Sequence, residues 1–265
     1  MSVIIPTFKS DRTLERCLAS VRREAPSGEV IVLDRFSPDR TCDIARKMGA
    51  RLIQADFGRA EARNLGIDHS GGEYVMLLDA DQELTEHTMR ECVDAVVSAR
   101  ADAVTVPELF LGEGFWGGSS ALWKNTVAVA EGVDGGIPRF FRARVVKEGL
   151  RFEDGAIYWE DIDAYRRMKS KGARTARCEG LIVHHEVGDS KEAGRKYFTY
   201  GKSATASPSG SARANLLRTL RTTFNVLAIL VKKPRKPISI YFGAFVVATL
   251  KASAFLMGLV SMKIG

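Results

Sequence analysis

Short apolar runs separated by amphipathic stretches occupy the first part of the chain. Three of these runs have the length and composition of buried strands: Ser2 to Phe8, Val30 to Leu33 and Arg51 to Gln54. Between the first two, Leu14, Leu18 and Val21 recur at helical spacing, and Gly58 to Ser70 predicts another helix. Strands that alternate with helices of this length predict an α/β fold with a mostly parallel, doubly wound sheet.

The strongest chemical signal lies in Tyr74 to Asp81, which reads YVMLLDAD. An apolar strand ends there at Asp79 and Asp81, and ligands of α/β proteins collect at the carboxyl ends of strands. Carboxylate oxygens suit a hard cation such as Mg²⁺ or Mn²⁺. The alternative is a helix whose acidic first turn, with Asp81 and Glu83, complements the helix dipole. The motif alone leaves both interpretations open.

Other polar residues end strands at the same edge of the predicted sheet. Thr7 lies at the carboxyl end of the first strand and Asp34 at that of the second, so we expect both to face the crevice that receives the two aspartates. The first strand pattern begins at Ser2, and we therefore expect no signal peptide.

Four segments occur in the order and at the spacing of one known family: IIPTF, VLDRFSPDRT, ARNLGIDHSGGEYVMLLDADQE and WEDIDAYRRMKSKG. Over residues 2 to about 205, the chain resembles a family 2 glycosyltransferase with the Rossmann-like GT-A fold. The resemblance implies a nucleotide-sugar donor that lies across the first half of the sheet. It also implies a divalent metal, Mg²⁺ or Mn²⁺, that bridges the diphosphate of the donor.

The resemblance assigns roles on the donor side residue by residue. Thr7 and Asp34 would meet the base and the ribose. Asp79 would lie near the ribose and serve the metal, and Asp81 would bind the metal. The further donor-binding residues that it implies are Pro6, Arg63 and Asn64. Two departures leave the identity of the base open: Arg35-Phe36 replaces the usual acidic or glycine pair, and Gln82 replaces a more frequent acid.

The acceptor side is expected in the second half of the chain. Pro138 to Val146 alternates as a strand, and the glycine-rich Gly112 to Gly136 is expected to form a flexible loop or lid. A helix is expected to open at Glu160 and Asp161, whose carboxylates would by themselves only favour its dipole. The resemblance gives this pair a catalytic role, with Asp161 as the base for the acceptor hydroxyl and Glu160 as the residue that orients the acceptor.

Histidines and basic residues complete the implied site. His184 and His185 follow an apolar strand and point to opposite sides, so at most one faces the crevice. The family often places a histidine here that contacts the metal or the diphosphate, and we expect His185 to take that role. Arg195, Tyr200 and Lys202 are expected to clamp the diphosphate or the phosphate of a lipid acceptor. A solvated amphipathic helix is the alternative for this segment.

Composition argues against several other classes of protein. The chain has 265 residues, 45% of them hydrophobic, which is enough for one catalytic domain and an appendage. Its four cysteines form no Cys-x-x-Cys pair, so neither a zinc site nor a disulfide framework is predicted, and reduced thiols fit a cytosolic domain. The net charge of +7 comes without a recognised nucleic-acid module. The net positive charge is better explained by binding of a diphosphate donor and of anionic membrane lipids.

A change in composition marks the tail. Small, polar residues form a linker from Ala204 to Ala212, and the amphipathic Asn215 to Val231 is expected to lie in a membrane interface. A basic run then precedes Ile238 to Met262, which is long enough to cross a bilayer or to dip into it. A span would bury Lys251 in a cavity or a homo-oligomer, whereas a soluble core helix is the alternative. The expected parts are thus residues 1–205, 206–237 and 238–265.

The sequence therefore predicts a membrane-attached, inverting glycosyltransferase with its catalytic domain on the cytoplasmic face. Its donor is expected to be GDP-mannose or a UDP-sugar, and its acceptor a membrane-associated saccharide or lipid. A polyprenyl-phosphate sugar synthase is the alternative among enzymes, and Asp161 would then position an acceptor that is already anionic. A non-catalytic nucleotide-binding assembly protein is the alternative from another class, which the intact Asp-x-Asp and Glu-Asp pairs disfavour.

Overall fold

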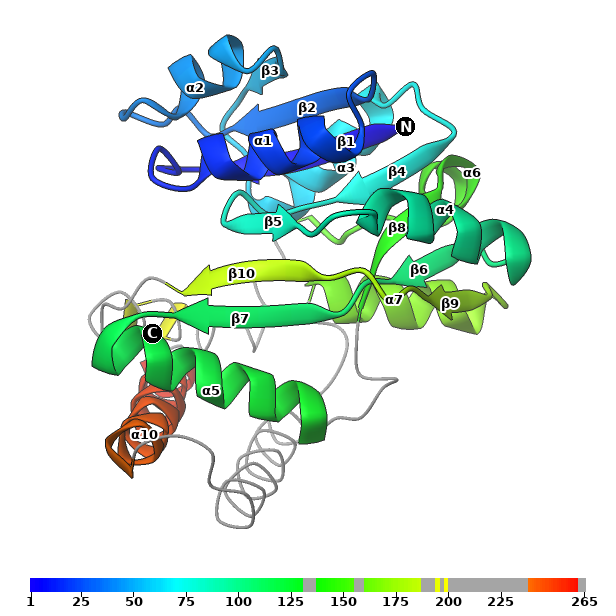
Figure 1. The fold of residues 1–265 in the computed structure, drawn as a ribbon. Coiled ribbons are helices and arrows are strands. Elements are labelled where there is room, and N and C mark those ends of the chain that lie inside the picture. Colours follow the sequence, from blue (N-terminus) through cyan, green and yellow to red (C-terminus); the bar gives the residue numbers. More distant parts are fainter. Residues whose placement is uncertain (131–136, 155–159, 187–193, 196–197, 200–237, 262–265) are drawn as a thin grey trace. The chain divides into compact units, whose positions relative to one another are not determined.

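The computed structural model describes residues 1–130, 137–154, 160–186, 194–195, 198–199 and 238–261 (Figure 1). The chain divides into two compact units. The first comprises Met1–Glu108 and Gly136–His184, and the second comprises Leu109–Gly135 and His185–Gly265.

A seven-stranded sheet forms the centre of the first unit. Its strands are β1 (Ser2–Thr7), β2 (Glu29–Asp34), β3 (Arg51–Gln54), β4 (Tyr74–Leu77), β6 (Ala103–Thr105), β8 (Pro138–Arg142) and β9 (Thr175–Arg177), in the order β3-β2-β1-β4-β8-β6-β9. β1 runs parallel to β2 and β4, and β2 runs parallel to β3, which confirms the predicted parallel core. The carboxyl ends of β1, β2 and β4 therefore meet at one edge of the sheet, where Thr7 pairs in register with Asp34.

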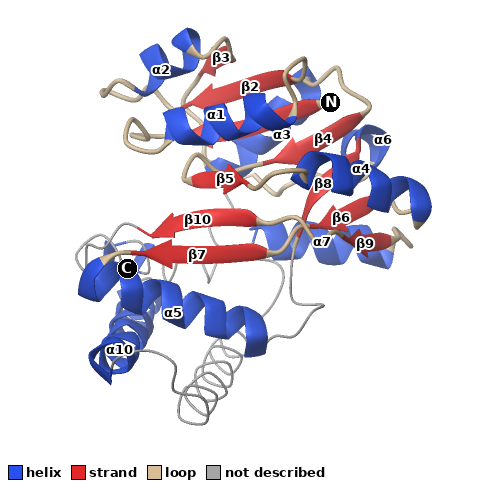
Figure 2. Ribbon diagram, in the orientation of Figure 1, coloured by secondary structure: helices blue, strands red, loops and turns tan. Residues whose placement is uncertain are grey.

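Helices cover both faces of this sheet, because side chains of each strand alternate between two apolar cores (Figure 2). In β1, Val3 and Ile5 face one core and Ile4 faces the other. The first core is closed by α1 (Leu14–Glu24), α2 (Thr41–Lys47) and α4 (Thr88–Ser98). The second core is closed by α3 (Arg59–His69), α6 (Ala143–Glu148) and α7 (Glu160–Ser170).

Helix α3 lies unusually close to β1 because Gly66 faces the strand. A Cβ atom at Gly66 would lie 2.3 Å from Cγ2 of Ile4, closer than packed atoms approach. The bare backbone lets the helix sit low over the sheet. This position brings Arg63, one turn earlier on α3, into the buried interior, where only 2% of the residue is exposed.

The predicted strand from Pro138 to Val146 is only half right. β8 ends at Arg142, and the chain turns directly into α6. The adjacent residues Val145 and Val146 both pack in the second core, which the alternation of a strand would not allow. The apolar residues after Arg142 therefore pack in the core from a helix and not from a strand.

A smaller sheet consists of β5 (Gln82–Leu84), β10 (Ile182–Glu186) and β7 (Glu108–Gly112), in the order β5-β10-β7. β5 follows the Asp-x-Asp turn and pairs with β10 in antiparallel fashion. In this register, Gln82 lies opposite His184 and Leu84 lies opposite Ile182. The pairing therefore fixes the histidine segment next to the turn that carries Asp79 and Asp81.

The second unit contains two long helices, α5 (Gly114–Ala130) and α10 (Ile238–Ser261). They contact each other where Trp123 of α5 packs against Ala244 and Ala248 of α10. A Cβ atom at Gly243 would lie 2.0 Å from Oγ of Ser119, so the two backbones approach closely.

The predicted loop or lid from Gly112 to Gly136 is wrong over most of its length, because residues 114–130 form a helix. Its glycines weaken helix propensity, yet small residues such as Ser119 allow the close contact with α10. Packing therefore outweighs local propensity in this segment.

None of the helices in the described ranges is long and apolar enough to cross a membrane. The span that the sequence predicts within residues 238–265 is thus not found there, and α10 instead buries small residues against α5. The linker, the amphipathic segment Asn215 to Val231 and the basic run lie outside the described residues.

Candidate active site

A dense hydrogen-bond cluster surrounds Asp34 at the end of β2. Its carboxylate accepts hydrogen bonds from Oγ1 of Thr7 at 2.9 Å and from Oγ of Ser37 at 2.6 Å. The backbone N–H of Ser37 and the thiol of Cys42 also donate to it. Burial acts to raise the pKa of Asp34, but these hydrogen bonds outweigh burial and lower it. Asp34 is therefore an ionised group that holds the ends of β1 and β2 together.

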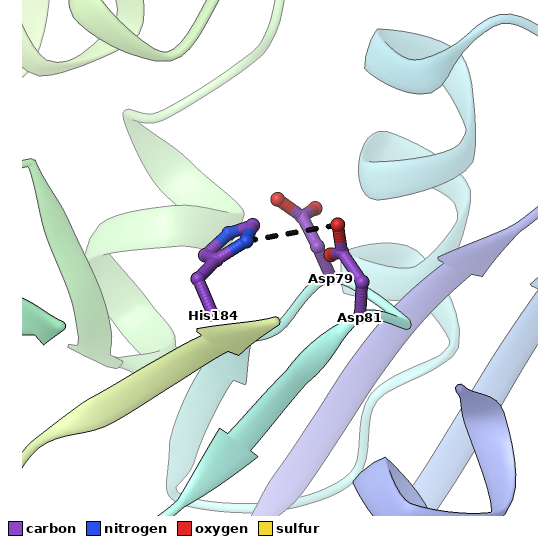
Figure 3. Close-up of side chains that lie close together, drawn as sticks. All are labelled: Asp79, Asp81 and His184. Carbon is purple, nitrogen blue, oxygen red and sulfur yellow. Dashed lines mark ion pairs between the residues drawn. The ribbon is translucent and has the colours of Figure 1, made fainter. Parts of the chain in front are cut away.

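The Asp-x-Asp turn and β10 bring three potential metal ligands together. One ligand atom each from Asp79, Asp81 and His184 lies within 4.8 Å of the others, and the side chains converge in Figure 3. Nδ1 of His184 lies 3.6 Å from Oδ2 of Asp81. Two carboxylates and an imidazole suit Mn²⁺ or Mg²⁺, so the donor set fits the metal that the family resemblance implies.

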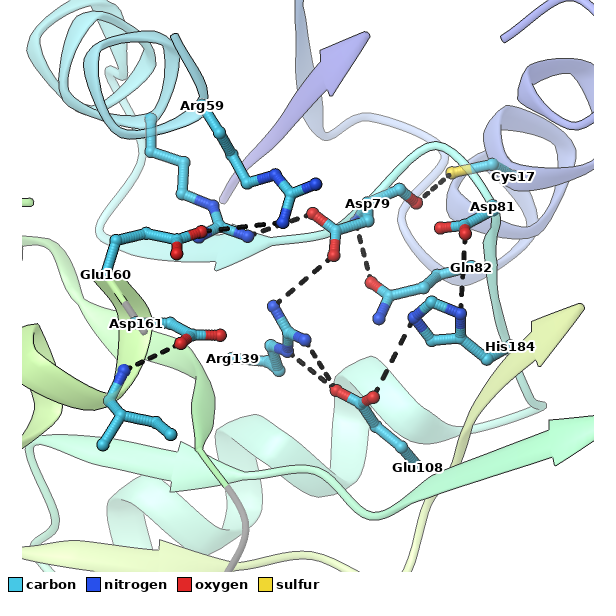
Figure 4. Close-up of polar contacts among 12 residues, drawn as sticks. Cys17, Arg59, Asp79, Asp81, Gln82, Glu108, Arg139, Glu160, Asp161 and His184 are labelled. Atoms are coloured by element: carbon cyan, nitrogen blue, oxygen red, sulfur yellow. Dashed lines mark hydrogen bonds and ion pairs between the residues drawn. The ribbon is translucent and has the colours of Figure 1, made fainter. Parts of the chain in front are cut away.

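Two arginines hold Asp79 (Figure 4). Nη2 of Arg63 donates to Oδ1 of Asp79 at 3.1 Å, and Nη1 of Arg139 lies 3.9 Å from Oδ2. Burial would raise the pKa of Asp79, but Arg63 and Arg139 hold it well below its usual range. Asp79 is thus an ionised anchor between arginines, whereas the side chain of Asp81 is 42% exposed and more accessible to a cation.

Arg63 also reaches the acidic pair at the start of α7. Its Nη1 donates to Oε1 of Glu160 at 3.1 Å, and Nη1 of Arg59 lies 3.7 Å from the same oxygen. Burial and the neighbouring Asp161 raise the pKa of Glu160, against the opposing effect of Arg63 and Arg59. One buried guanidinium therefore connects the Asp-x-Asp turn with the Glu-Asp pair.

Asp161 lies at the beginning of α7, where its Oδ1 accepts a hydrogen bond from the backbone N–H of Ile162 at 2.8 Å. The side chain lines a small cavity together with Arg63, Arg139, Phe152 and Tyr165. Arginine and aromatic side chains thus line the same cavity as this carboxylate. The carboxylate of Asp161 therefore borders this cavity.

Other residues expected from the sequence occupy different surroundings. Asn64 exchanges hydrogen bonds with the backbone of Phe152 at 2.8 and 3.0 Å, which joins α3 to the segment before α7. Pro6 lies in β1 opposite Leu33. Arg195 is exposed, and Tyr200 and Lys202 lie outside the described residues.

Three members of the site escape sequence reasoning. The histidine beside the aspartates is His184, whereas we expected His185, which is not part of this group. Arg139 and Glu108 form an ion pair of 2.8 Å between Asp79 and His184. A charged residue between the apolar Pro138 and Phe140 of β8 was the available signal for Arg139, and Glu108 has no comparable signal.

Curated relatives match the chain over part of its length. The 4,4'-diaponeurosporenoate glycosyltransferase of Staphylococcus haemolyticus is 32% identical over 104 residues, which cover 36% of this chain and 28% of that protein. A TPR repeat-containing protein of Synechococcus elongatus is 40% identical over 95 residues, covering 35% of this chain and 23% of its own length. The chain thus spans only about a quarter of these two relatives.

Solved structures match the fold over a larger share. The mannosyltransferase PcManGT from Pyrobaculum calidifontis, in complex with GDP-Man and Mn²⁺, is similar with a TM-score of 0.64 and 16% identity, covering 99% of this chain and 86% of that chain. At this level of identity the likeness shows the fold. The family model for Glycosyl transferase family 2 matches residues 2–173, which is more than half of the chain and includes both acidic motifs. The chain therefore belongs to glycosyl transferase family 2.

Proposed function

We propose that this protein is a glycosyltransferase that moves a sugar from a nucleotide-sugar donor to an acceptor hydroxyl. The observation that carries the proposal is the connection of the two acidic motifs through Arg63. This residue contacts Asp79 on one side and Glu160 on the other, both at 3.1 Å. A transferase needs its donor-binding and acceptor-activating groups a few ångströms apart, and this contact sets that separation.

Asp81 and His184 are the residues that would hold a divalent cation, with Asp79 beside them. When bound, such a cation supplies positive charge to the diphosphate as it leaves the sugar. Arg63 and Arg139 neutralise Asp79 and so reduce the negative charge that an anionic leaving group would meet. The mannosyltransferase of similar fold contains Mn²⁺, which supports Mn²⁺ or Mg²⁺ as the metal.

Asp161 accepts the proton of the attacking acceptor hydroxyl in this proposal. It is within the same cavity as Arg63 and Arg139, and Glu160 beside it is fixed by Arg63 and Arg59. Glu160 therefore keeps the start of α7 in place and orients the acceptor. Direct attack of the hydroxyl on the anomeric carbon inverts its configuration.

The donor is proposed to be GDP-mannose or a UDP-sugar. Structures of similar fold support both classes, since one contains GDP-Man and another, TarS 1-349 from S. aureus, contains UDP-GlcNAc. The second has a TM-score of 0.54 at 14% identity and covers 100% of this chain and 91% of that chain. The base is expected to lie near Thr7 and Asp34, whose mutual hydrogen bond defines the edge of the sheet.

We also propose that the protein works at the cytoplasmic face of a membrane, on a membrane-associated saccharide or lipid acceptor. Large apolar side chains of α10 support this: Phe242 is 64% exposed and Phe245 is 50% exposed. The basic run at residues 232–236 precedes them and would attract anionic lipids. The same features support a polyprenyl phosphate as an alternative acceptor, for which Asp161 would be a positioning residue. We expect the protein to co-sediment with anionic vesicles at low salt and to lose this binding at high salt.

A thermal-shift panel tests the activity proposal. The purified chain is heated with GDP, UDP, GDP-mannose and UDP-sugars, each with and without Mn²⁺. A ligand at 100 times its dissociation constant stabilises the folded state by about 2.7 kcal/mol, enough for a visible shift. We expect stabilisation by one class of nucleotide that requires the metal, followed by release of that nucleoside diphosphate when acceptor is added. Metal-dependent binding without turnover on any acceptor would favour the non-catalytic alternative.

A further inference from the structure

We infer that Glu108 and Arg139 act together as a clamp that fixes the imidazole of His184 for metal binding. This inference rests on the metal site proposed above and adds two residues outside the Asp-x-Asp and Glu-Asp motifs. The side chains of Asp81, His184, Glu108, Arg139 and Asp79 follow one another in a series of polar contacts. Figure 4 shows Glu108 between Arg139 and the imidazole.

The two ring nitrogens of His184 face different partners. Nδ1 lies 3.6 Å from Oδ2 of Asp81, on the side of the potential ligands. Nε2 lies 3.9 Å from Oε2 of Glu108. An imidazole that binds a cation through one nitrogen must carry its proton on the other, and a carboxylate facing that second nitrogen favours this tautomer and holds the ring plane. Glu108 is placed to do both.

Glu108 itself is held in one orientation by Arg139. Nε and Nη2 of Arg139 both contact Oε1 of Glu108, at 2.9 and 2.8 Å. This double contact occupies one carboxylate oxygen and leaves Oε2 on the side of His184. A guanidinium that donates twice to one carboxylate gives a more defined geometry than a single contact would.

Arg139 joins the clamp to the other half of the site. It is 8% exposed, and its Nη1 lies 3.9 Å from Oδ2 of Asp79. Its single positive charge is thus shared by two carboxylates in the interior. The arrangement connects Asp79 on the turn with His184 on β10, two members of the potential ligand set.

A purely structural ion pair is the competing explanation for Glu108 and Arg139. That explanation predicts that loss of Glu108 changes stability but acts on the metal only through the loss of one negative charge. A clamp predicts that Glu108 acts on the metal through His184. The two predictions separate in a double-mutant cycle, because residues that act through one another are not additive.

The test measures the affinity of the full chain for Mn²⁺ in the absence of nucleotide. The fraction of bound Mn²⁺ is obtained from the loss of the electron paramagnetic resonance signal of the free ion. Glu108→Gln should weaken Mn²⁺ binding about 10- to 100-fold, the range typical of outer-shell partners of metal ligands. The same substitution in a His184→Gln background should cause no further loss. Asp102→Asn is the matched control, because Asp102 forms a comparable 3.0 Å pair with Arg144 outside the site. The Mn²⁺ affinity of this variant should equal that of the wild type.

Glu108→Asp covers the case in which the glutamine variant does not fold. It keeps the negative charge for Arg139 and withdraws the carboxylate from His184 by one methylene, so Mn²⁺ affinity should fall while the unfolding midpoint changes little. Additive losses in the double-mutant cycle, or wild-type affinity in both Glu108 variants, would overturn the clamp and leave the proposed function untouched. A wild-type chain that binds no Mn²⁺, alone or with nucleotide, would instead contradict the metal site itself.

Discussion

Arg63 and Glu160 form an ion pair of 3.1 Å in which the two side chains are only 2% and 3% exposed. One residue lies on α3 and the other begins α7, on the same face of the large sheet. A buried pair of this kind contributes little net stability compared with an apolar replacement, but the loss of one partner leaves an uncompensated charge. The pair is better understood as a device that fixes the position of α7 relative to Asp79.

Removal of this arginine should therefore be costly. Arg63→Met should lower the free energy of unfolding by about 3–5 kcal/mol, because Glu160 and Asp79 both lose their buried partner. Urea denaturation measures the change. Arg151→Met is the control, since Arg151 forms an equally close but half-exposed pair with Asp68 and should cost at most about 1 kcal/mol. Equal losses in the free energy of unfolding for the two variants would show that the buried pair matters no more for stability than the half-exposed one.

Loss of Asp81 should separate metal-dependent binding from folding. The side chain of Asp81 is 42% exposed, so Asp81→Ala should leave the thermal unfolding midpoint almost unchanged. Nucleotide-sugar binding in the presence of Mn²⁺, measured by titration calorimetry, should disappear because the cation loses an anionic ligand. Glu83→Gln changes an acid two positions further along, which pairs with Arg16, and should bind as the wild type does. Undiminished binding by the Asp81 variant would remove Asp81 from the metal site.

Substitution of the proposed base should affect turnover alone. Asp161→Asn keeps the shape and the hydrogen bond from Ile162 but loses the proton acceptor, so kcat should fall about 10²- to 10⁴-fold with donor affinity preserved. Asp163→Asn, on the same turn and paired with Arg167, is the control and should retain full activity. If Asp161→Asn turns over normally, the acceptor is better explained as a phosphate that needs no base.

The loss of stability at acid pH should depend in part on Asp34. The pKa of this carboxylate is lower in the folded protein than in the unfolded chain, where it is about 3.9. Between the two values the unfolded chain binds more protons, so the contribution to stability is complete above the unfolded pKa and is lost as the pH falls through the folded pKa. Asp34→Asn should flatten the decline of the unfolding free energy below about pH 4. Parallel acid profiles of the variant and the wild type would contradict this account.

Much of the large sheet was predictable because its strands carry their own pattern. β1 and β2 match the predicted runs to within a residue or two at each end, since their side chains are buried on both faces and the apolar sequence is continuous. The Asp-x-Asp turn was predictable for the same reason: a buried strand that stops at two carboxylates marks a sheet edge.

The failures share a dependence on long-range pairing. Alternation says that His184 and His185 face opposite ways, but only the β5–β10 register, with His184 opposite Gln82, decides which one reaches the aspartates. Helix α5 was missed because its glycines lower helix propensity, and its packing partner α10 lies more than a hundred positions away. Glu108 joins the site through its contacts with Arg139 and His184, which are distant in the sequence, so no local pattern predicts its role.

The position of Arg63 also bears on the order in which the molecule assembles. Its partners lie 16 positions away at Asp79 and 97 positions away at Glu160. On simple chain statistics, the longer loop costs about 1.6 kcal/mol more in closure entropy than the shorter one. During synthesis from the N-terminus, α3 and the first four strands emerge well before α7, and Arg63 can pair only with Asp79 at that stage. The contact between Arg63 and Glu160 can therefore form only late in synthesis, after β1 to β4 and α3 have emerged.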